Sequence, residues 1–230
     1  MAGDDMRSTG YRAGLNEDKI AEGALRLTGC KGINGWSMRD LAAELDVSPS
    51  VVYHYFPNRE AICTAVLERV GSMVEVPDSK LPWKDWFLAV SLSMRKALLA
   101  HNGVADLLLV NRFPLSLVPI AEGGVGKLRE AGFGDLTPYA YAMIMNTALG
   151  AIAARDHRSA NERNQKVDLA QTVRELGEHA AGSQALSEFL STFMAPLAEQ
   201  DRGEGAGEMS DRYFTLIIRS MLNGIESTLK

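Results

Sequence analysis

Apolar residues recur every three or four positions along most of the chain, which is the spacing of an amphipathic α-helix. The first such stripe follows Asn16, a favourable N-cap residue, and is closed by Gly29 and Gly32. No strand-like alternation of any length and no internal repeat is present. The pattern therefore predicts an all-α protein.

Three further helix starts follow closely after the first. Ser37 caps a helix with Asp40 at its third position, Ser48 caps another that begins with Pro49, and Asn58 caps a fourth. Each cap contributes about 1 kcal/mol. Four short helices within about sixty residues predict a compact bundle.

Longer helices are predicted after the proline-containing linker 75–82, which is the expected domain boundary. We expect a flexible arm over 1–14, a first domain over 15–76 and a second over 77–230. Apolar stripes in the second domain predict helices over 83–98, 104–112, 136–154, 186–197 and 213–229, with a glycine-broken piece over 117–131. Residues 155–166 are polar and predict a frayed helix end and a loop, and Gly203, Gly205 and Gly207 predict a flexible connection.

The stretch Leu136–Ala154 is 19 residues long and carries no charge, so it reaches the length of a membrane-spanning candidate. It is rich in alanine and includes Pro138 and Asn146, so we interpret it as the central helix of a soluble protein. The N-terminus carries Asp4 and Asp5 without an apolar run, which predicts no signal peptide and a cytoplasmic protein.

The segment Ser37–Phe56 has the plan of a helix-turn-helix, with two short capped helices joined by a tight turn. Ala42 is small enough for the helix crossing, and Val47 and Val52 are apolar anchors. Asp46 suits the turn because aspartate adopts positive φ more readily than most residues.

At 100° per residue, Ser50, Tyr53, His54 and Pro57 share the outer face of the second helix of this motif, whereas Val52 and Phe56 point inward. An exposed Tyr-His pair can donate hydrogen bonds to phosphate or reach base edges. An ordinary helical hairpin, with Tyr53 covering the core, is the alternative.

The segments Ser37–Leu45 (SMRDLAAEL) and Val51–Ala61 (VVYHYFPNREA) resemble the DNA-binding signature of TetR-family transcriptional regulators. A weaker resemblance to the tetracycline repressor subgroup extends into the second half, at 95–99, 132–133, 149–151 and 214–226. The resemblance implies an N-terminal three-helix helix-turn-helix DNA-binding domain joined to a larger helical ligand-binding and dimerisation domain. It further implies a homodimer that binds a double-stranded DNA operator and is released by a small-molecule effector.

Charge does not favour a general polyanion binder, because the net charge is −5. Up to Arg59 the chain carries seven basic residues against eight acidic ones, so DNA binding needs a local patch. By resemblance Arg39 contacts a base, and Tyr53 and Arg59 contact phosphate. The whole set of predicted DNA-contacting residues is Arg39, Ser48, Pro49, Ser50, Tyr53, His54, Tyr55 and Arg59.

Met and aromatic residues at helical spacing in the second domain suit a pocket for a bulky hydrophobic effector, although such a stripe is as often ordinary core. The candidate lining residues are Trp86, Val90, Met94, Leu108, Arg112, Phe113, Tyr141, Met145 and Asn146. The candidate dimer residues on the last helix are Phe214, Ile217, Met221 and Ile225, which together with the uncharged helix would form a four-helix bundle.

The chain differs from the tetracycline repressor subgroup at the positions that bind the drug–magnesium complex. The His and Glu through which that repressor binds its drug–magnesium complex align with Leu108 and Ala154, neither of which ligates a hard cation. We therefore expect no metal site, no cofactor and an effector other than tetracycline–magnesium. The sequence has no catalytic motif, so we expect that the protein is not an enzyme. Two alternatives to an effector-controlled regulator remain: a helical ligand-binding protein without DNA affinity, and a DNA-binding protein without an effector.

Overall fold

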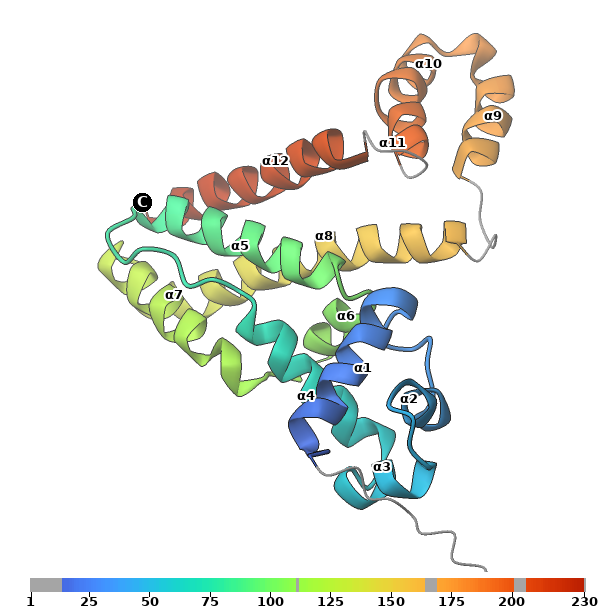
Figure 1. Cartoon of the computed structure of the whole chain (residues 1–230). Helices are drawn as coiled ribbons and strands as arrows, with labels where there is room; N and C mark the ends of the chain where they lie inside the picture. The colour runs from blue at the N-terminus through green and yellow to red at the C-terminus, as the bar shows by residue number, and fades with distance from the viewer. Residues whose placement is uncertain (1–13, 111, 164–168, 201–205, 230) are drawn as a thin grey trace, which may run out of the picture. The chain divides into compact units, whose positions relative to one another are not determined.

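The computed structural model describes residues 14–110, 112–163, 169–200 and 206–229 (Figure 1). The chain forms two compact units, Met1–Val66 and Leu67–Lys230. The division lies inside helix α4 (Arg59–Ser72), so the contacts separate the chain earlier than the composition, which placed the boundary after Val76. The predicted arm lies outside the described residues apart from Gly14.

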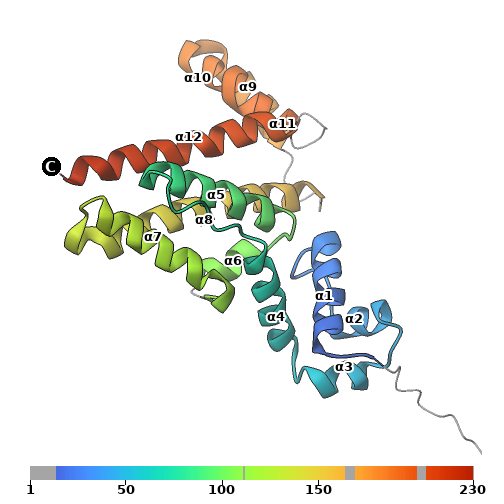
Figure 2. The ribbon, with the colours of Figure 1, turned by 60° about the vertical axis from the view of Figure 1, so that its left-hand side comes forward.

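The first unit contains α1 (Glu17–Lys31), α2 (Met38–Glu44), α3 (Pro49–Tyr55) and the beginning of α4 (Figure 2). The predicted caps are confirmed at both outer helices. Asn16 Oδ1 accepts the N–H of Lys19 at 2.9 Å, and Asn58 Oδ1 accepts the N–H of Ala61 at 2.9 Å. Gly32 ends α1 with φ 78°, a backbone angle that glycine adopts without strain.

The core of this unit is built from the inward stripes of its helices. Its fully buried members include Ile20, Leu41, Val52 and Ile62, one from each helix. Gly23 brings α1 close to the end of α2, because a Cβ there would lie 2.9 Å from Leu45 Cδ2. The first unit is thus held by apolar packing around all four helices.

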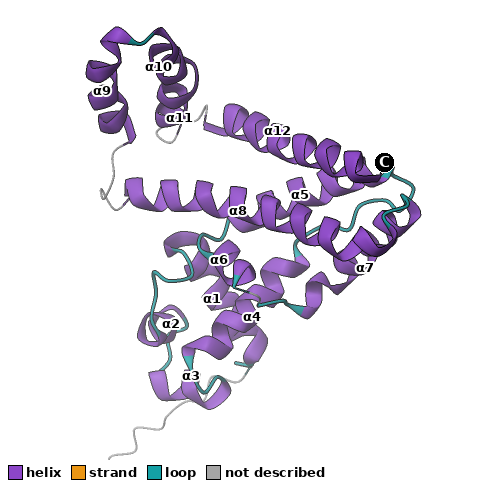
Figure 3. Ribbon diagram, turned by 180° about the vertical axis from the view of Figure 1, so that it is seen from behind, coloured by secondary structure: helices purple, strands orange, loops and turns teal. Residues whose placement is uncertain are grey.

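The second unit is built on three helices that pack on one another, α5 (Trp83–Leu99), α8 (Thr137–Arg163) and α12 (Ala206–Glu226). Helix α7 (Val118–Glu130) packs on α5 and α8. The other helical segments are α6 (Val104–Leu109), η1 (Leu115–Leu117), η2 (Gly134–Leu136), α9 (Leu169–His179), η3 (Ala180–Gly182), α10 (Gln184–Phe189), the π-helical turn η4 (Leu190–Met194), α11 (Ala195–Gln200) and η5 (Ser227–Leu229). All regular structure in the described ranges is helical (Figure 3), as the sequence predicted.

The glycines of α7 do not break the helix, which corrects the prediction of an interrupted piece. A Cβ on Gly123 would lie 2.8 Å from Trp86, and one on Gly124 would lie 2.8 Å from Tyr141. The glycines therefore let α7 approach the aromatic side chains of α5 and α8.

The central helix α8 is longer than predicted and continues through the polar segment to Arg163. No helix in the described part of the chain is long and apolar enough to cross a membrane. Helix α9 was not predicted, and the expected helix 186–197 is divided among α10, η4 and α11. The predicted glycine connection falls largely on 201–205, outside the described residues.

Candidate nucleic-acid interface and effector pocket

The turn between α2 and α3 is a Schellman motif, the most common way to close a helix end. The N–H of Val47 donates to Ala42 O at 2.9 Å, and the N–H of Asp46 donates to Ala43 O at 3.1 Å. Asp46 has φ 52°, the one positive φ recorded for a non-glycine residue in the described chain. The predicted role of Asp46 in the turn is confirmed.

The start of α2 is fixed by a reciprocal capping box. Asp40 Oδ2 accepts the N–H of Ser37 at 2.7 Å and its hydroxyl at 2.6 Å, while Ser37 Oγ accepts the N–H of Asp40 at 3.2 Å. These hydrogen bonds lower the pKa of the Asp40 carboxyl below its ordinary value. The neighbouring Arg39 lies exposed on the first turn of this helix.

Helix α3 presents the predicted face to solvent. Tyr53 is 50% exposed and Ser50 and His54 are exposed, whereas Val52 and Phe56 are buried beneath them. The hairpin alternative, in which Tyr53 covers the core, therefore does not hold. The DNA-contacting roles of Tyr53 and His54 stay predictions.

The N-terminus of α3 carries a pair of linked hydroxyls. Ser48 Oγ and Ser50 Oγ lie 2.8 Å apart, and Ser48 makes no side-chain cap to the helix. Pro49 at the first position is exposed. Pro49 has no N–H and the N–H of Val51 donates to Ser48 O at 3.0 Å, so the DNA roles of Ser48, Pro49 and Ser50 stay predictions.

Two residues predicted to contact DNA also have partners inside the unit. Tyr55 is half-buried and donates its hydroxyl to Leu15 O at 3.0 Å. Arg59 donates from Nε to Trp36 O at 3.2 Å and from Nη2 to Ile33 O, with its guanidinium 4.9 Å above the Trp36 ring. The DNA roles of Tyr55 and Arg59 stay predictions. Tyr55 ties α3 to the residue before α1, and Arg59 ties the start of α4 to the loop between α1 and α2.

The sequence analysis missed the support beneath this interface. The Trp36 indole donates to Thr28 Oγ1 at 3.0 Å, and Thr28 donates to Ala24 O at 2.8 Å. Thr28 stood in the predicted inward stripe of the first helix, but nothing in the spacing pointed to Trp36 as its partner.

The predicted effector residues differ in burial within the second unit, and their role as an effector site stays a prediction. Trp86, Val90 and Met94 are fully buried in the core, and burial raises the pKa of Tyr141 to about 12. Leu108, Arg112 and Met145 are half-buried, while Phe113 and Asn146 are exposed. The aromatic members therefore serve the packing of α5, α7 and α8.

A pocket of about 120 Å³ lies where α5, α8 and α12 meet. Its lining residues are Arg95, Ala151, Ala154, Arg155, Arg158, Ser210, Tyr213, Phe214 and Ile217. None of the predicted effector residues is among them. The apolar periodicity of the sequence could not predict that three arginines line this pocket. Two of them, Arg155 and Arg158, lie in the segment that was predicted to be a frayed helix end and a loop.

The helix-turn-helix segment matches a family of known proteins. Residues 20–66 match the model of the bacterial regulatory proteins of the tetR family. These residues run from the first buried position of α1 through the helix-turn-helix into α4. This segment of the chain is therefore similar to the DNA-binding segment of the TetR family.

The TetR-family likeness extends beyond that segment. An HTH-type transcriptional repressor from Streptomyces coeruleorubidus, DrrR1, is 29% identical over 161 residues, which are 68% of this chain and 59% of that repressor. A solved structure of a possible TetR family transcriptional regulator from Streptomyces coelicolor A3(2) covers 93% of this chain and 100% of its own, with TM-score 0.71 and 23% identity. A second solved structure is that of the Streptomyces coelicolor TetR family protein ActR in complex with actinorhodin. The match covers 92% of this chain and 95% of the ActR chain, with TM-score 0.65 and 24% identity.

The predicted dimer residues divide between the interior and the surface of the second unit. Phe214 and Ile225 are buried inside the protomer, so their side chains belong to its own core. Ile217 and Met221 are half-buried, and Ile217 lines the pocket. The most exposed apolar side chain of α12 is Leu216, which the prediction did not include.

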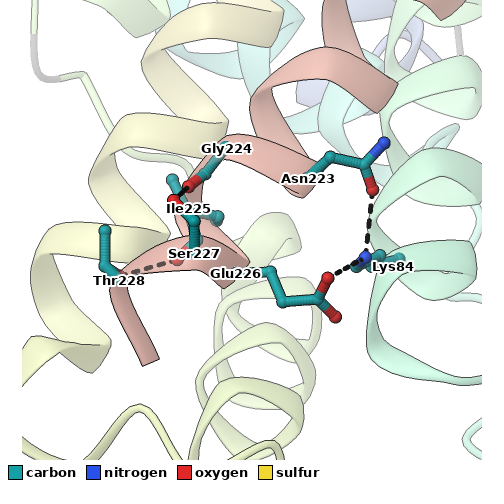
Figure 4. Close-up of polar contacts among 7 residues, drawn as sticks. All are labelled: Lys84, Asn223, Gly224, Ile225, Glu226, Ser227 and Thr228. Atoms are coloured by element: carbon teal, nitrogen blue, oxygen red, sulfur yellow. Dashed lines mark hydrogen bonds and ion pairs between the residues drawn. The ribbon is translucent and has the colours of Figure 1, made fainter. Parts of the chain in front are cut away.

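The end of α12 is fastened to the start of α5 (Figure 4). Lys84 Nζ lies 2.6 Å from Glu226 Oε2 and donates to Asn223 Oδ1 at 3.0 Å. The contact joins segments more than a hundred residues apart in sequence, so sequence spacing could not reveal it. It fixes α12 along α5 and with it one wall of the pocket.

Proposed function

We propose that this chain is a TetR-family transcriptional repressor that binds a pseudo-palindromic DNA operator as a homodimer. A small, largely hydrophobic effector bound by the second unit releases it from the operator. The exposed face of α3 carries the proposal: Ser50, Tyr53 and His54 face solvent on a helix that is anchored by Val52 and Phe56. A helix of this kind enters the DNA major groove with its N-terminal residues toward the bases.

The homodimer is supported by apolar surface on two helices that pack on each other. Leu216 on α12 is 61% exposed, Tyr139 on α8 is 69% exposed, and Met143 lies one turn after Tyr139. A two-fold dimer through these faces would present two α3 helices to successive major grooves, about 34 Å apart. The operator is then expected to be a pseudo-palindrome.

Selection of duplexes from a random pool, followed by titration of the selected site, tests the proposal. We expect Arg39→Ala to weaken operator binding by about 1–3 kcal/mol and to leave random-sequence binding much less affected, as for a bidentate base contact. Tyr53→Phe, which removes one hydroxyl, should weaken both DNAs alike because it contacts phosphate. Equal losses on both DNAs for Arg39→Ala would assign that residue to the backbone.

A helical ligand-binding protein without DNA affinity is the second candidate, and the net charge of −1 up to Arg59 favours it. A salt titration separates the two candidates. A DNA binder loses affinity steeply as salt rises, because each phosphate contact releases counterions. No selected duplex and no salt-dependent binding at low ionic strength would favour the ligand-binding protein.

A further inference from the structure

The loop between α1 and α2 is packed closely on the end of α1. It directly precedes Ser37, the N-cap of α2. The N–H of Gly35 donates to Gly32 O at 3.0 Å, and a Cβ on Gly35 would lie 2.1 Å from Lys31 O. The loop therefore folds back so closely that it admits no side chain at Gly35.

Trp36, the last residue of this loop, is anchored on α1. It is only 4% exposed, and its indole N–H donates to Thr28 Oγ1 at 3.0 Å. Thr28 is fully buried and donates in turn to Ala24 O at 2.8 Å. A buried donor is costly to leave unpaired, so the indole has one favoured position.

Arg59, on the first turn of α4, holds the same loop to α4. Its Nε donates to Trp36 O at 3.2 Å, its Nη2 donates to Ile33 O, and its guanidinium carbon lies 4.9 Å from the centre of the Trp36 ring. Hydrogen bonds from a charged donor are stronger than those between neutral groups, and a cation above an indole ring adds to them. The guanidinium group of Arg59 is therefore directed at the loop, whereas the resemblance to the family implied a phosphate contact.

The position of this loop sets the position of Arg39. Trp36 is followed by Ser37, whose hydrogen bonds with Asp40 fix the first turn of α2. Arg39 lies in that turn, three residues after Trp36, and is exposed. A bidentate contact with a base edge requires the side chain to be placed within about 0.5 Å, so a shift at the start of α2 weakens it.

We propose that Arg59 is a positioning residue for Arg39 and not a phosphate contact. Through Trp36 it holds the start of α2 at the angle from which Arg39 reads a base. The inference rests on the proposed function, because it assigns sequence selectivity to a residue that does not itself touch DNA. Arg59 then determines how well the chain distinguishes the operator from other DNA, and not how many phosphates the chain neutralises.

Arg59→Lys separates the two roles, because lysine also binds phosphate but cannot donate two fixed hydrogen bonds or stack a planar group on the indole. Affinities of the full chain for the selected operator duplex and for a random duplex are measured by fluorescence anisotropy. We expect the operator affinity to fall about tenfold and the random-duplex affinity to change less than about twofold. Arg26→Lys, the same change at an exposed position on α1, is the control and should bind both duplexes as wild type does.

A double-mutant cycle shows whether Arg59 acts through Arg39. In the Arg39→Ala background, Arg59→Lys should change operator affinity less than about twofold, because the base contact that it positions is already absent. A loss of about tenfold in that background, or an equal loss on both duplexes in the single variant, would overturn the inference.

Arg59→Gln tests the phosphate contact directly, because it removes the charge. A phosphate contact contributes about 0.9 to the slope of log affinity against log salt concentration. We expect the slope for the random duplex to be the same in Arg59→Gln and wild type. A slope reduced by about 0.9 would assign Arg59 to phosphate and overturn the inference.

Hydrogen exchange of the free chain tests the inference without DNA. Amides over 36–41 should exchange at least about tenfold faster in Arg59→Lys than in wild type, whereas those of α5 and α8 should be unchanged. Unchanged exchange over 36–41 would overturn the inference, and so would faster exchange throughout the chain, which marks a general loss of stability. Faster exchange over 36–41 alone in a chain that selects no duplex would reject the operator proposal and retain the link from Arg59 to the start of α2.

Discussion

Asp46 shows how one backbone angle fixes the angle between two helices. Its φ of 52° is required by the Schellman motif that closes α2 and turns the chain into α3. Aspartate and asparagine tolerate this region, whereas a β-branched side chain clashes with its own backbone there.

Substitutions at Asp46 should therefore differ in their effect on stability. Asp46→Val should lower the free energy of unfolding by about 1–2 kcal/mol, whereas Asp46→Asn should change it little. Urea unfolding followed by circular dichroism measures both, and operator affinity should fall with the valine variant because α3 is displaced. Equal stability of the two variants would show that the turn does not depend on this angle.

Tyr141 makes the stability of the second unit depend on alkaline pH. Burial raises its pKa to about 12 from the ordinary tyrosine value of 10.0, so above pH 10 the unfolded chain loses the phenol proton while the folded chain keeps it. The stabilisation is complete below the unfolded pKa and is lost as pH rises through the folded one.

Wild type should therefore lose about 1 kcal/mol more stability than Tyr141→Phe between about pH 9 and about pH 11. Urea midpoints at the two pH values measure the difference. A phenolate absorbance step near pH 12 should also be absent from Tyr141→Phe. If the phenolate titration curves of wild type and Tyr141→Phe were the same near pH 12, the Tyr141 hydroxyl would not have the raised pKa of a buried group, and the prediction would be contradicted.

At the scale of elements, one carboxylate of α4 binds the backbone of η1, the short helical segment that precedes α7. Glu68 Oε1 accepts the N–H of Leu115 at 2.8 Å, and Oε2 accepts the N–H of Ser116 at 2.9 Å. Gly71, one turn later, allows the close approach, because a Cβ there would lie 2.3 Å from Ser116 Oγ. All four residues belong to the second unit, so the contact fixes the end of α4 within that unit.

Glu68→Gln keeps the shape of the side chain but removes the charge and one acceptor oxygen. We expect it to lower the free energy of unfolding by about 1–2 kcal/mol, as for other hydrogen bonds to a charged group. Glu122→Gln, an exposed change of the same kind on α7, serves as the control. Equal stability of Glu68→Gln and wild type would show that the contact does not stabilise the end of α4.

At the scale of the whole molecule, the proposed dimer depends on side chains that the protomer leaves exposed. Leu216→Arg should yield monomers in analytical ultracentrifugation and weaken operator binding, because a single α3 reads only half a site. Leu176→Arg places the same charge on α9, and we expect this variant to stay dimeric. Monomers in both variants, or dimers in both, would move the interface away from the α12 face.

Local signals predicted the first unit better than the second. Asn16, Ser37, Pro49 and Asn58 mark helix starts through interactions within a few residues, and each start was found where it was predicted. The glycines of α7 were misread as a break, because only the position of Trp86 and Tyr141 across the unit explains them.

The sequence by itself determined the helical class, the helix starts of the first unit and the exposed face of α3, because these follow from helical periodicity and from hydrogen bonds between near neighbours. The predicted side-chain cap of Ser48 is the exception, because its hydroxyl pairs with that of Ser50. Tertiary structure decided which apolar stripes were interior, as with Phe214 and Ile225, and which distant residues met, as with Arg95 and Asp211. It also brought Arg95 of α5 and Arg155 and Arg158 of α8 to one pocket. Burial, and contacts between residues far apart in the sequence, depend on how the helices pack. A helix's own periodicity does not show which neighbouring helix will cover it.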